Sequence, residues 1–200
     1  MKQYLAIDVG GTSTKYALVS EQGELAEKHK QPTARNSRAE FMAAMTALIH
    51  RYQGQIAGVG LALPGVVNQQ QGIVKTCAAL PFLETIPLAA RLKDAAHLNM
   101  PVVIGNDGNA AALAEHWQGK LVGTINSAMI VLGTGVGAAL FLNGTLYTGS
   151  HDVSGEPSFM ITNGLNPITR AQTAAGLSAV KTVNAMAAAQ HIRGHNLGPR

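Results

Sequence analysis

Apolar residues at the start of the chain alternate with polar ones and are broken by glycine pairs. YLAIDV (residues 4–9) precedes Gly10-Gly11, and TKYALVS and ELAEKH follow, separated by Gly23. This pattern predicts three strands joined by tight turns. Ser37, with Glu40 three residues later, forms a capping-box pattern and predicts the start of a helix. The apolar positions of that helix fall on one face: Phe41, Met45, Leu48 and Ile49.

Further strands and helices alternate through the middle of the chain. Residues 56–65 form a glycine-interrupted apolar strand that ends at Pro64-Gly65, and residues 85–96 are expected to form a helix. Residues 101–107 predict a strand ending at Asp107, after which Asn109 is expected to cap a helix.

The last third begins with a strand and a hairpin. We expect a strand over residues 129–132, a hairpin over 138–147 with Asn143-Gly144 as its turn, and an alanine-rich helix over 174–189. Strands that alternate with helices after an antiparallel opening predict an α/β sheet with helices on both faces. A boundary near residues 120–124 divides the chain into 1–120 and 121–200.

Composition narrows the class of protein. The chain is 46% hydrophobic and 13% charged, as in a compact soluble protein. Its net charge of +4 comes from Arg170, Lys181, Arg193 and Arg200, whereas residues 1–156 are neutral. A nucleic-acid partner is therefore not expected. Cys77 is the only cysteine, and no leader or bilayer-length apolar run is seen. We expect a cytoplasmic protein with a buried structural thiol and no membrane contact.

The first cluster with chemical potential is DVGGTSTKYAL (residues 8–18). Glycines allow close approach of the backbone to an anion, and Thr12, Ser13 and Thr14 bring hydroxyls and N–H groups to the same turn. Asp8, on the strand that leads in, can hold Mg²⁺ through water. Lys15 has two interpretations, a phosphate contact or a place on the exposed face of the second strand.

The second cluster, GTGVG (residues 133–137), also follows an apolar strand. It is either a second phosphate loop or a glycine-rich hairpin. No helix follows it and no acidic residue stands at the required offset, so it is not a dinucleotide fingerprint.

The third cluster is IGNDGNAAALAEHW (residues 104–117). Asp107 stands where a strand ends and a helix begins, the usual place for ligands in an α/β sheet. A carboxylate there can accept the proton of an attacking hydroxyl. The alternative is a helix-capping role, which Asn109 fills better.

Taken in order, these clusters resemble the motifs of the ROK sugar kinases (repressor, open reading frame, kinase), within the actin and hexokinase ATPase superfamily. The resemblance also includes GVGLALPGVVN (residues 58–68) and SGE (residues 154–156), and it covers essentially the whole chain. It implies a two-lobed, actin-like ATPase (ribonuclease H-like) fold whose second lobe is incomplete, because relatives continue beyond the helix that residues 174–189 resemble.

The resemblance also implies roles for individual residues. Asp107 would be the general base for a sugar hydroxyl, and Gly65, Asn106 and Glu156 would contact the sugar. Asp8 would hold Mg²⁺ through water. The phosphates of ATP would lie against the two glycine turns, with these residues as nucleotide contacts: Gly10, Gly11, Thr12, Thr14, Lys15, Gly133, Thr134 and Gly135.

One departure from the family pattern concerns zinc. Many relatives have a histidine three residues after the loop glutamate and a cysteine-rich loop after it, whereas this chain has Phe159 there and no later cysteine. We therefore predict no zinc site, and His151 alone does not make one. The absent motif favours a kinase that acts on substrates such as β-glucosides or N-acetylmannosamine over a zinc-bearing glucokinase.

Three functions are compared. The first is an ATP- and Mg²⁺-dependent hexose kinase, expected as a homodimer. The second, a sugar-responsive repressor, would need a helix-turn-helix domain before the strand that starts at Tyr4. The third is a sugar-binding fragment without catalysis, whose half-built second lobe would expose apolar surface and favour dimerisation or aggregation.

Overall fold

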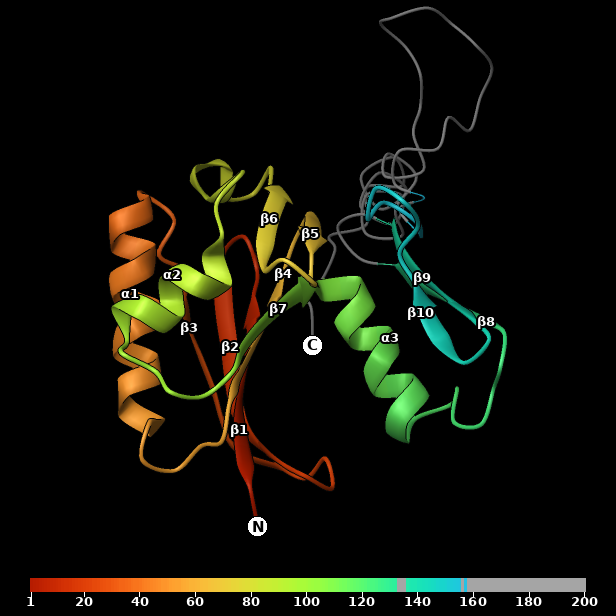
Figure 1. The fold of residues 1–200 in the computed structure, drawn as a ribbon, viewed down its shortest axis with the longest axis horizontal. Coiled ribbons are helices and arrows are strands. Elements are labelled where there is room, and N and C mark those ends of the chain that lie inside the picture. The colour runs from red at the N-terminus through yellow and green to blue at the C-terminus, as the bar shows by residue number, and fades with distance from the viewer. Residues whose placement is uncertain (133–135, 156, 158–200) are drawn as a thin grey trace, which may run out of the picture. The chain divides into compact units, whose positions relative to one another are not determined.

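The protein divides into two compact units, residues 1–114 and 115–200. The computed structural model describes residues 1–132, 136–155 and 157 (Figure 1). The division falls inside the third helix, six residues before the 120/121 boundary favoured by the sequence. Among the described helices, none combines the length and apolarity that a membrane crossing requires.

Unit 1 is built on a mixed five-stranded sheet of order β3-β2-β1-β4-β7 (Figure 1). The first three strands are antiparallel, and β1, β4 and β7 run parallel. The strands are β1 (Gln3–Val9), β2 (Ser13–Ser20), β3 (Leu25–Pro32), β4 (Val59–Leu63) and β7 (Val102–Asn106). The antiparallel opening and the two later strands confirm the sequence prediction.

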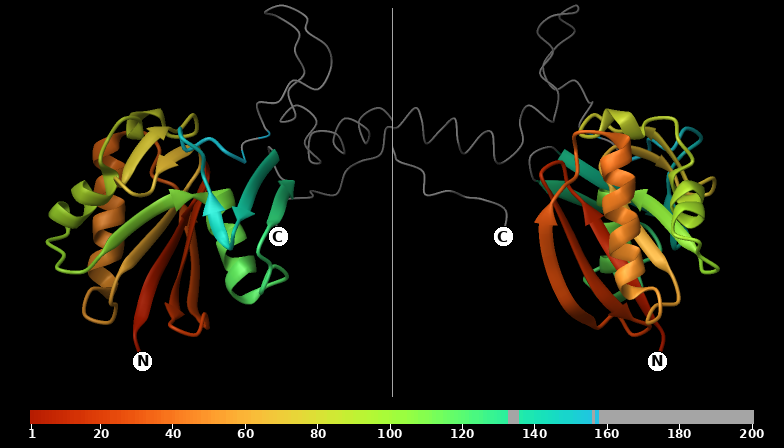
Figure 2. Two further views of the ribbon diagram at one scale, coloured as in Figure 1. Left: turned by 45° about the vertical axis from the view of Figure 1, so that its right-hand side comes forward. Right: turned by 90° about the vertical axis from the view of Figure 1, so that its left-hand side faces the viewer.

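Two helices, α1 (Arg38–Tyr52) and α2 (Leu88–Ala95), cover one face of this sheet (Figure 2). The predicted cap of α1 is confirmed, because the Ser37 side chain accepts a 3.2 Å hydrogen bond from the Glu40 N–H. The predicted apolar face is also buried, together with Tyr52. The inward-pointing residues of the strands complete the core, among them Leu5, Ile7, Leu61, Leu63 and Ile104.

The segment before α2 departs from the prediction. Thr85 has a φ of +61° and its N–H donates a 2.8 Å hydrogen bond to the carbonyl of Val74. Ile86 pairs with the same residue as an isolated bridge, so the expected helix over 85–96 begins only at Leu88. The sequence reading also missed three short elements: β5 (Val66–Asn68), β6 (Ile73–Thr76) and η1 (Pro81–Leu83).

Unit 2 contains the end of α3 (Asp107–Gln118) and a three-stranded antiparallel sheet. Its strands are β8 (Ser127–Leu132), β9 (Val136–Leu142) and β10 (Thr145–Tyr147). The predicted turn is confirmed, since Asn143 and Gly144 have φ values of +54° and +73°. Alternate residues of β8 are exposed, with Ile130 at 67% and Leu132 at 62%. This agrees with the expectation that the second unit exposes apolar surface. The helix predicted over 174–189 lies outside the described residues.

Candidate active site

Two candidate residues, Asp8 and Asn106, stand at the carboxyl ends of β1 and β7, the parallel strands on either side of β4. Asp8 of β1 is level with Ala62 of β4, and Ala62 is level with Gly105 of β7, directly before Asn106. Two strand spacings, roughly 10 Å, therefore separate the end of β1 from the end of β7. Ligands of open α/β sheets bind at this edge.

The turn between β1 and β2 presents backbone N–H groups at that edge. The Gly10 N–H donates a 3.0 Å hydrogen bond to the Ser13 carbonyl, and a Cβ on Gly10 would lie 2.9 Å from that oxygen. Thr12 is exposed in the turn. Among the described residues, no hydrogen-bond acceptor is found for the N–H groups of Gly11 and Thr12. The turn thus has the form of an anion-binding nest.

Thr14 contributes to this turn from inside the protein. Its side chain is fully buried, and its hydroxyl lies 3.0 Å from the hydroxyl of Thr33. Any contact between Thr14 and a nucleotide therefore has to be indirect.

Lys15 lies on the exposed face of β2, directly across the ladder from Asp8. Its Nζ is 3.6 Å from Asp8 Oδ2, and the two side chains are 54% and 50% exposed. An ion pair this exposed adds little to stability. The Asp8 carboxylate remains accessible, which suits a group that binds a hydrated cation.

Asp107 is the first residue of α3 and remains exposed. Atoms around its carboxyl group displace part of the surrounding water, and this desolvation raises the pKa of Asp107. The Gly108 N–H, which donates a 2.8 Å hydrogen bond to Oδ1, opposes the rise, while the negative charge of Asp8 adds to it. A raised pKa makes the ionised carboxylate a stronger base.

Asn106 binds the turn after β4 to the start of α3. Its Nδ2 donates to the Gly65 carbonyl and its Oδ1 accepts from the Asn109 N–H, both at 2.9 Å. Asn106 is therefore the capping residue of α3, and the prediction that Asn109 caps this helix is wrong. The reason is that β7 ends one residue earlier than expected, so the helix begins at Asp107.

Gly65 is required by its conformation as well as by its position. Its φ is +97°, and a Cβ at this residue would collide with the carbonyl oxygen of Thr76. Its carbonyl is oriented by Asn106 rather than by a ladder partner.

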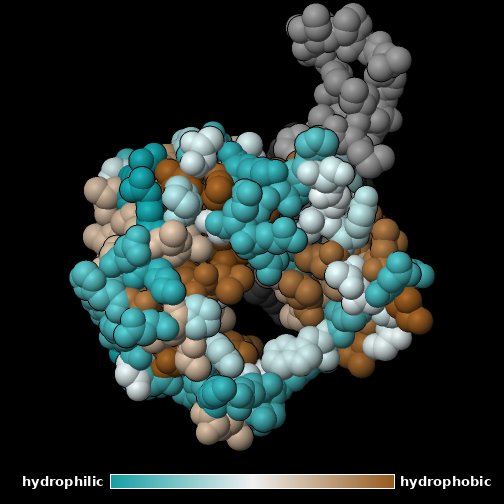
Figure 3. Space-filling view, in the orientation of Figure 1, coloured by the Kyte–Doolittle hydropathy of each residue, from teal (hydrophilic) through white to brown (hydrophobic). Residues whose placement is uncertain are grey.

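Beside these turns, the sheet face opposite α1 and α2 lines a cavity of about 700 Å³. Small residues of the strands form its floor, and the first turns of α3 form one wall. Its lining includes Ala6, Asp8, Lys15, Gly60, Ala62 and Asn109. On the face drawn in Figure 3, patches of hydrophobic residues (brown) lie among hydrophilic ones.

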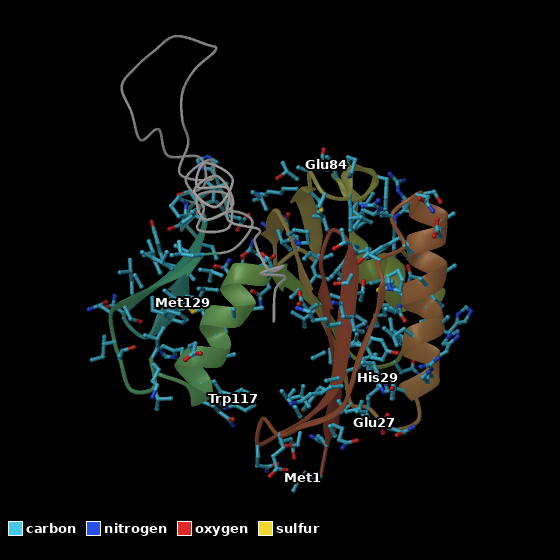
Figure 4. All side chains as sticks on the ribbon, turned by 180° about the vertical axis from the view of Figure 1, so that it is seen from behind. Met1, Glu27, His29, Glu84, Trp117 and Met129 are labelled. Atoms are coloured by element: carbon cyan, nitrogen blue, oxygen red, sulfur yellow. The ribbon has the colours of Figure 1, made fainter. Side chains whose placement is uncertain are left out.

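The sequence patterns did not predict three features near the strand ends: the hydrogen bond of Glu84, the loop over residues 77–80 and the contact of Thr33 with the first turn. Glu84 Oε1 accepts a 2.9 Å hydrogen bond from the Cys77 N–H, and Figure 4 shows Glu84 at the opposite end of unit 1 from His29. The loop over residues 77–80 approaches the first turn, since a Cβ on Gly11 would meet Ala79 Cβ at 3.4 Å. Thr33 supports the same turn. The sequence signal that could have identified Thr33 is its position as a polar residue directly after β3, the strand that pairs with β2.

Cys77 is fully buried and free, which confirms a structural thiol. Burial raises the pKa of its thiol. Some residues of the predicted site lie outside the described residues: Gly133, Thr134, Gly135 and Glu156. Phe159, which takes the place of the histidine in the zinc motif, lies outside them as well.

A family model described as ROK family matches residues 4–174. The chain belongs to the ROK family. It is 31% identical over 161 residues to a glucokinase of Halalkalibacterium halodurans, covering 76% of this chain and 48% of the relative. It is 30% identical over 155 residues to a beta-glucoside kinase of Listeria monocytogenes, covering 78% and 52%. The chain thus spans about half the length of the curated relatives it matches.

A solved structure supports the fold as well. A ROK family protein from Streptococcus pneumoniae, in complex with sucrose, matches with a TM-score of 0.78 and 27% identity, over 96% of this chain and 64% of that protein. The expected α/β, actin-like ATPase fold is confirmed.

Proposed function

We propose that the protein is an ATP-dependent sugar kinase that transfers the γ-phosphoryl group of ATP to a hydroxyl of a hexose or hexoside. The observation that carries the proposal is the placing of a base, an anion-binding turn and an exposed carboxylate at one edge of unit 1. Asp107, the Gly10 turn and Asp8 are these three groups. Membership of the ROK family and the kinases among the relatives support it.

In this proposal Asp107 accepts the proton of the sugar hydroxyl. The hydroxyl oxygen then forms a bond to the γ-phosphorus, while the bond between that phosphorus and the β,γ-bridging oxygen breaks and ADP leaves. Catalysis of this kind depends on positioning and charge neutralisation rather than on a covalent enzyme intermediate.

Substrate binding is divided between the two turns. N–H groups of Gly11 and Thr12 donate to phosphate oxygens, and Gly133–Gly135 are proposed as the second phosphate loop. The Gly65 turn, Asn106 and Glu156 contact sugar hydroxyls. Lys15 lies close enough to Asp8 to add positive charge beside the phosphates.

Mg²⁺ fits the chemistry of Asp8, because this carboxylate is exposed and adjoins the turn that would bind phosphate. When bound, Mg²⁺ neutralises phosphate charge. Asp8 would hold it through water.

The substrate class proposed is glucose, a β-glucoside or N-acetylmannosamine. The full-length gene product, purified and given ATP, Mg²⁺ and a panel of these sugars, is expected to form one sugar phosphate in preference, detected by mass spectrometry. The absence of any sugar phosphate, with ATP binding retained, would refute the kinase proposal and favour a sugar-binding regulator. We also propose that the protein is a homodimer and is cytoplasmic. Light scattering of the same sample tests the dimer.

A further inference from the structure

Thr33 follows β3 and lies under the turn between β1 and β2, with only 7% of its surface exposed. Its Oγ1 donates a 2.7 Å hydrogen bond to the Gly10 carbonyl. Its N–H donates a 3.0 Å hydrogen bond to the Thr12 carbonyl. One residue thus binds the turn at two of its carbonyl groups.

The direction of these hydrogen bonds settles a third one. A threonine hydroxyl has a single hydrogen, and that of Thr33 goes to Gly10. In the 3.0 Å contact between the hydroxyls of Thr14 and Thr33, Thr14 is therefore the donor. Thr14 is fully buried, so removal of the Thr33 hydroxyl would leave both the Thr14 hydroxyl and the Gly10 carbonyl without this partner.

The consequence for the turn is an orientation of its peptide groups. The carbonyls of Gly10, Thr12 and Ser13 all accept hydrogen bonds from unit 1 itself. A peptide group whose carbonyl points inward directs its N–H the opposite way. The Gly10 and Thr12 carbonyls belong to the peptides whose N–H groups are those of Gly11 and Ser13. Thr33 therefore acts on the side of the turn that faces away from the candidate phosphate site.

We propose that Thr33 is a positioning residue of the nucleotide site, which orients the Gly10–Ser13 turn so that its N–H groups meet phosphate oxygens. This inference rests on the proposed function, because it assigns the turn to ATP. Thr33 touches neither the substrate nor the reacting atoms. It acts through the backbone of the turn, by two hydrogen bonds and by its contact with Thr14.

The test is a graded series at one position, measured on the full-length protein. Thr33→Val keeps the shape of the side chain and removes the hydroxyl, Thr33→Ser restores the hydroxyl, and Thr33→Cys keeps a weak donor. The affinity for Mg²⁺·AMP-PNP is expected to fall about five- to thirtyfold in Thr33→Val, by an intermediate factor in Thr33→Cys and less than about twofold in Thr33→Ser. Sugar affinity is expected to stay unchanged throughout.

A matched control separates positioning from a general loss of stability. The Thr124 hydroxyl also donates to a carbonyl oxygen at 2.7 Å, that of Leu121, in a loop that carries no candidate site residue. Thr124→Val is expected to lower the melting temperature by less than Thr33→Val does, because Thr124 is only partly buried, with no change in nucleotide affinity. Equal nucleotide affinity in folded Thr33→Val and wild type would overturn the proposal, and so would an equal loss in Thr124→Val.

A second measurement keeps this inference distinct from the proposed function. Amide ¹⁵N relaxation without nucleotide is expected to show greater motion of Gly11 and Ser13, whose peptides carry the two carbonyls bound by Thr33, in Thr33→Val than in wild type, and recovery in Thr33→Ser. If wild type binds no nucleotide, the kinase proposal fails and the assignment to ATP falls with it. If wild type binds nucleotide but the amides are equally ordered in all variants, only the role of Thr33 is refuted.

Discussion

Two glycine turns stand at the same edge of unit 1, and different kinds of side chain stabilise them. The Gly10 turn follows β1 and is supported by hydroxyl and backbone groups of Thr33. The Gly65 turn follows β4 and is bound through its carbonyl by the carboxamide of Asn106. The N–H groups of Gly11 and Thr12 in the first turn point to their surroundings without an acceptor among the described residues. In the second turn, the Asn106 carboxamide uses its nitrogen for the Gly65 carbonyl and its oxygen for the Asn109 N–H.

The difference extends to the glycines. Gly65 has a φ of +97° and no space for a Cβ, while a Cβ on Gly11 would make only an ordinary contact with Ala79 at 3.4 Å. Gly10 also lacks space for a side chain, because its Cβ would lie 2.9 Å from the Ser13 carbonyl oxygen. The two turns therefore differ in that Gly65 has a positive φ as well, and in that Gly11 has room for a Cβ. Asp107 directly follows Asn106, and the negative charge of Asp8 contributes to the rise of its pKa.

The largest expected effect comes from removing the proposed base, Asp107. Asp107→Asn is expected to lower kcat for sugar phosphorylation about 10²- to 10⁴-fold, because the carboxamide accepts no proton from the hydroxyl. Steady-state kinetics with saturating ATP measure it. Unchanged kcat would show that another group is the base.

The pKa of Asp107 gives this prediction a pH dependence. Because that pKa is raised above its ordinary 3.8, kcat/KM is expected to fall with decreasing pH at a pKa above 3.8. The contribution of Asp107 to the free energy of unfolding changes with pH in the opposite direction. The folded state binds this proton more tightly than the unfolded state, so stability is lost as pH rises from the unfolded-state pKa through the raised pKa of the folded state. Thermal unfolding of Asp107→Asn at pH 7 is therefore expected at or above the wild-type temperature.

The next largest effect is expected from replacing a glycine in each turn and comparing the loss of stability. Gly65→Ala is expected to destabilise the protein by at least about 1–3 kcal/mol, since it adds backbone strain and a collision with Thr76. Gly11→Ala is the matched change in the other turn and is expected to cost much less. Thermal unfolding of both variants measures the difference. Equal melting temperatures would remove the contrast between Gly65 and Gly11.

Asn106 allows the bonds of the second turn to be separated. Asn106→Ala loses the helix cap, worth about 1 kcal/mol, together with the bond to Gly65. Asn106→Asp keeps the acceptor for the Asn109 N–H and replaces the donor to the Gly65 carbonyl with a negatively charged oxygen. We expect sugar affinity to fall in both variants and helix stability to fall only in Asn106→Ala. Calorimetric titration and thermal unfolding check these outcomes, and full sugar affinity in Asn106→Asp would contradict the role of that donor.

The smallest effect on stability is expected at Lys15. Its ion pair with Asp8 is exposed, so Lys15→Met is expected to change the free energy of unfolding by about 0–1 kcal/mol. A fall in AMP-PNP affinity that high salt abolishes would assign Lys15 to the phosphates. An affinity equal to that of wild type would leave it only as the partner of Asp8.

The elements governed by short sequence patterns were predictable. The β1–β2 turn, the Ser37 cap and the Asn143-Gly144 turn each depend on a few adjacent residues, and the structure confirms all three. Period, caps and turn residues together predicted the longer strands and helices of unit 1, but not β5, β6 and η1.

What could not be predicted depends on contacts between distant segments. Asn106 and Asn109 are both good caps, and only the end of β7 decides between them. Residues 85–87 look helical until Thr85 and Ile86 pair with Val74. Thr33 acquires its role only because β3 returns its end to the Gly10 turn, 23 residues away in sequence.

The central claim is that the Gly10 turn binds the phosphates of ATP while the Gly65 turn serves the sugar. A backbone NMR titration with Mg²⁺·AMP-PNP tests it most directly. We predict that nucleotide shifts the amide signals of Gly11 and Thr12 strongly and leaves that of Gly65 nearly unchanged. Saturation by nucleotide with no shift at Gly11 and Thr12 would contradict the account.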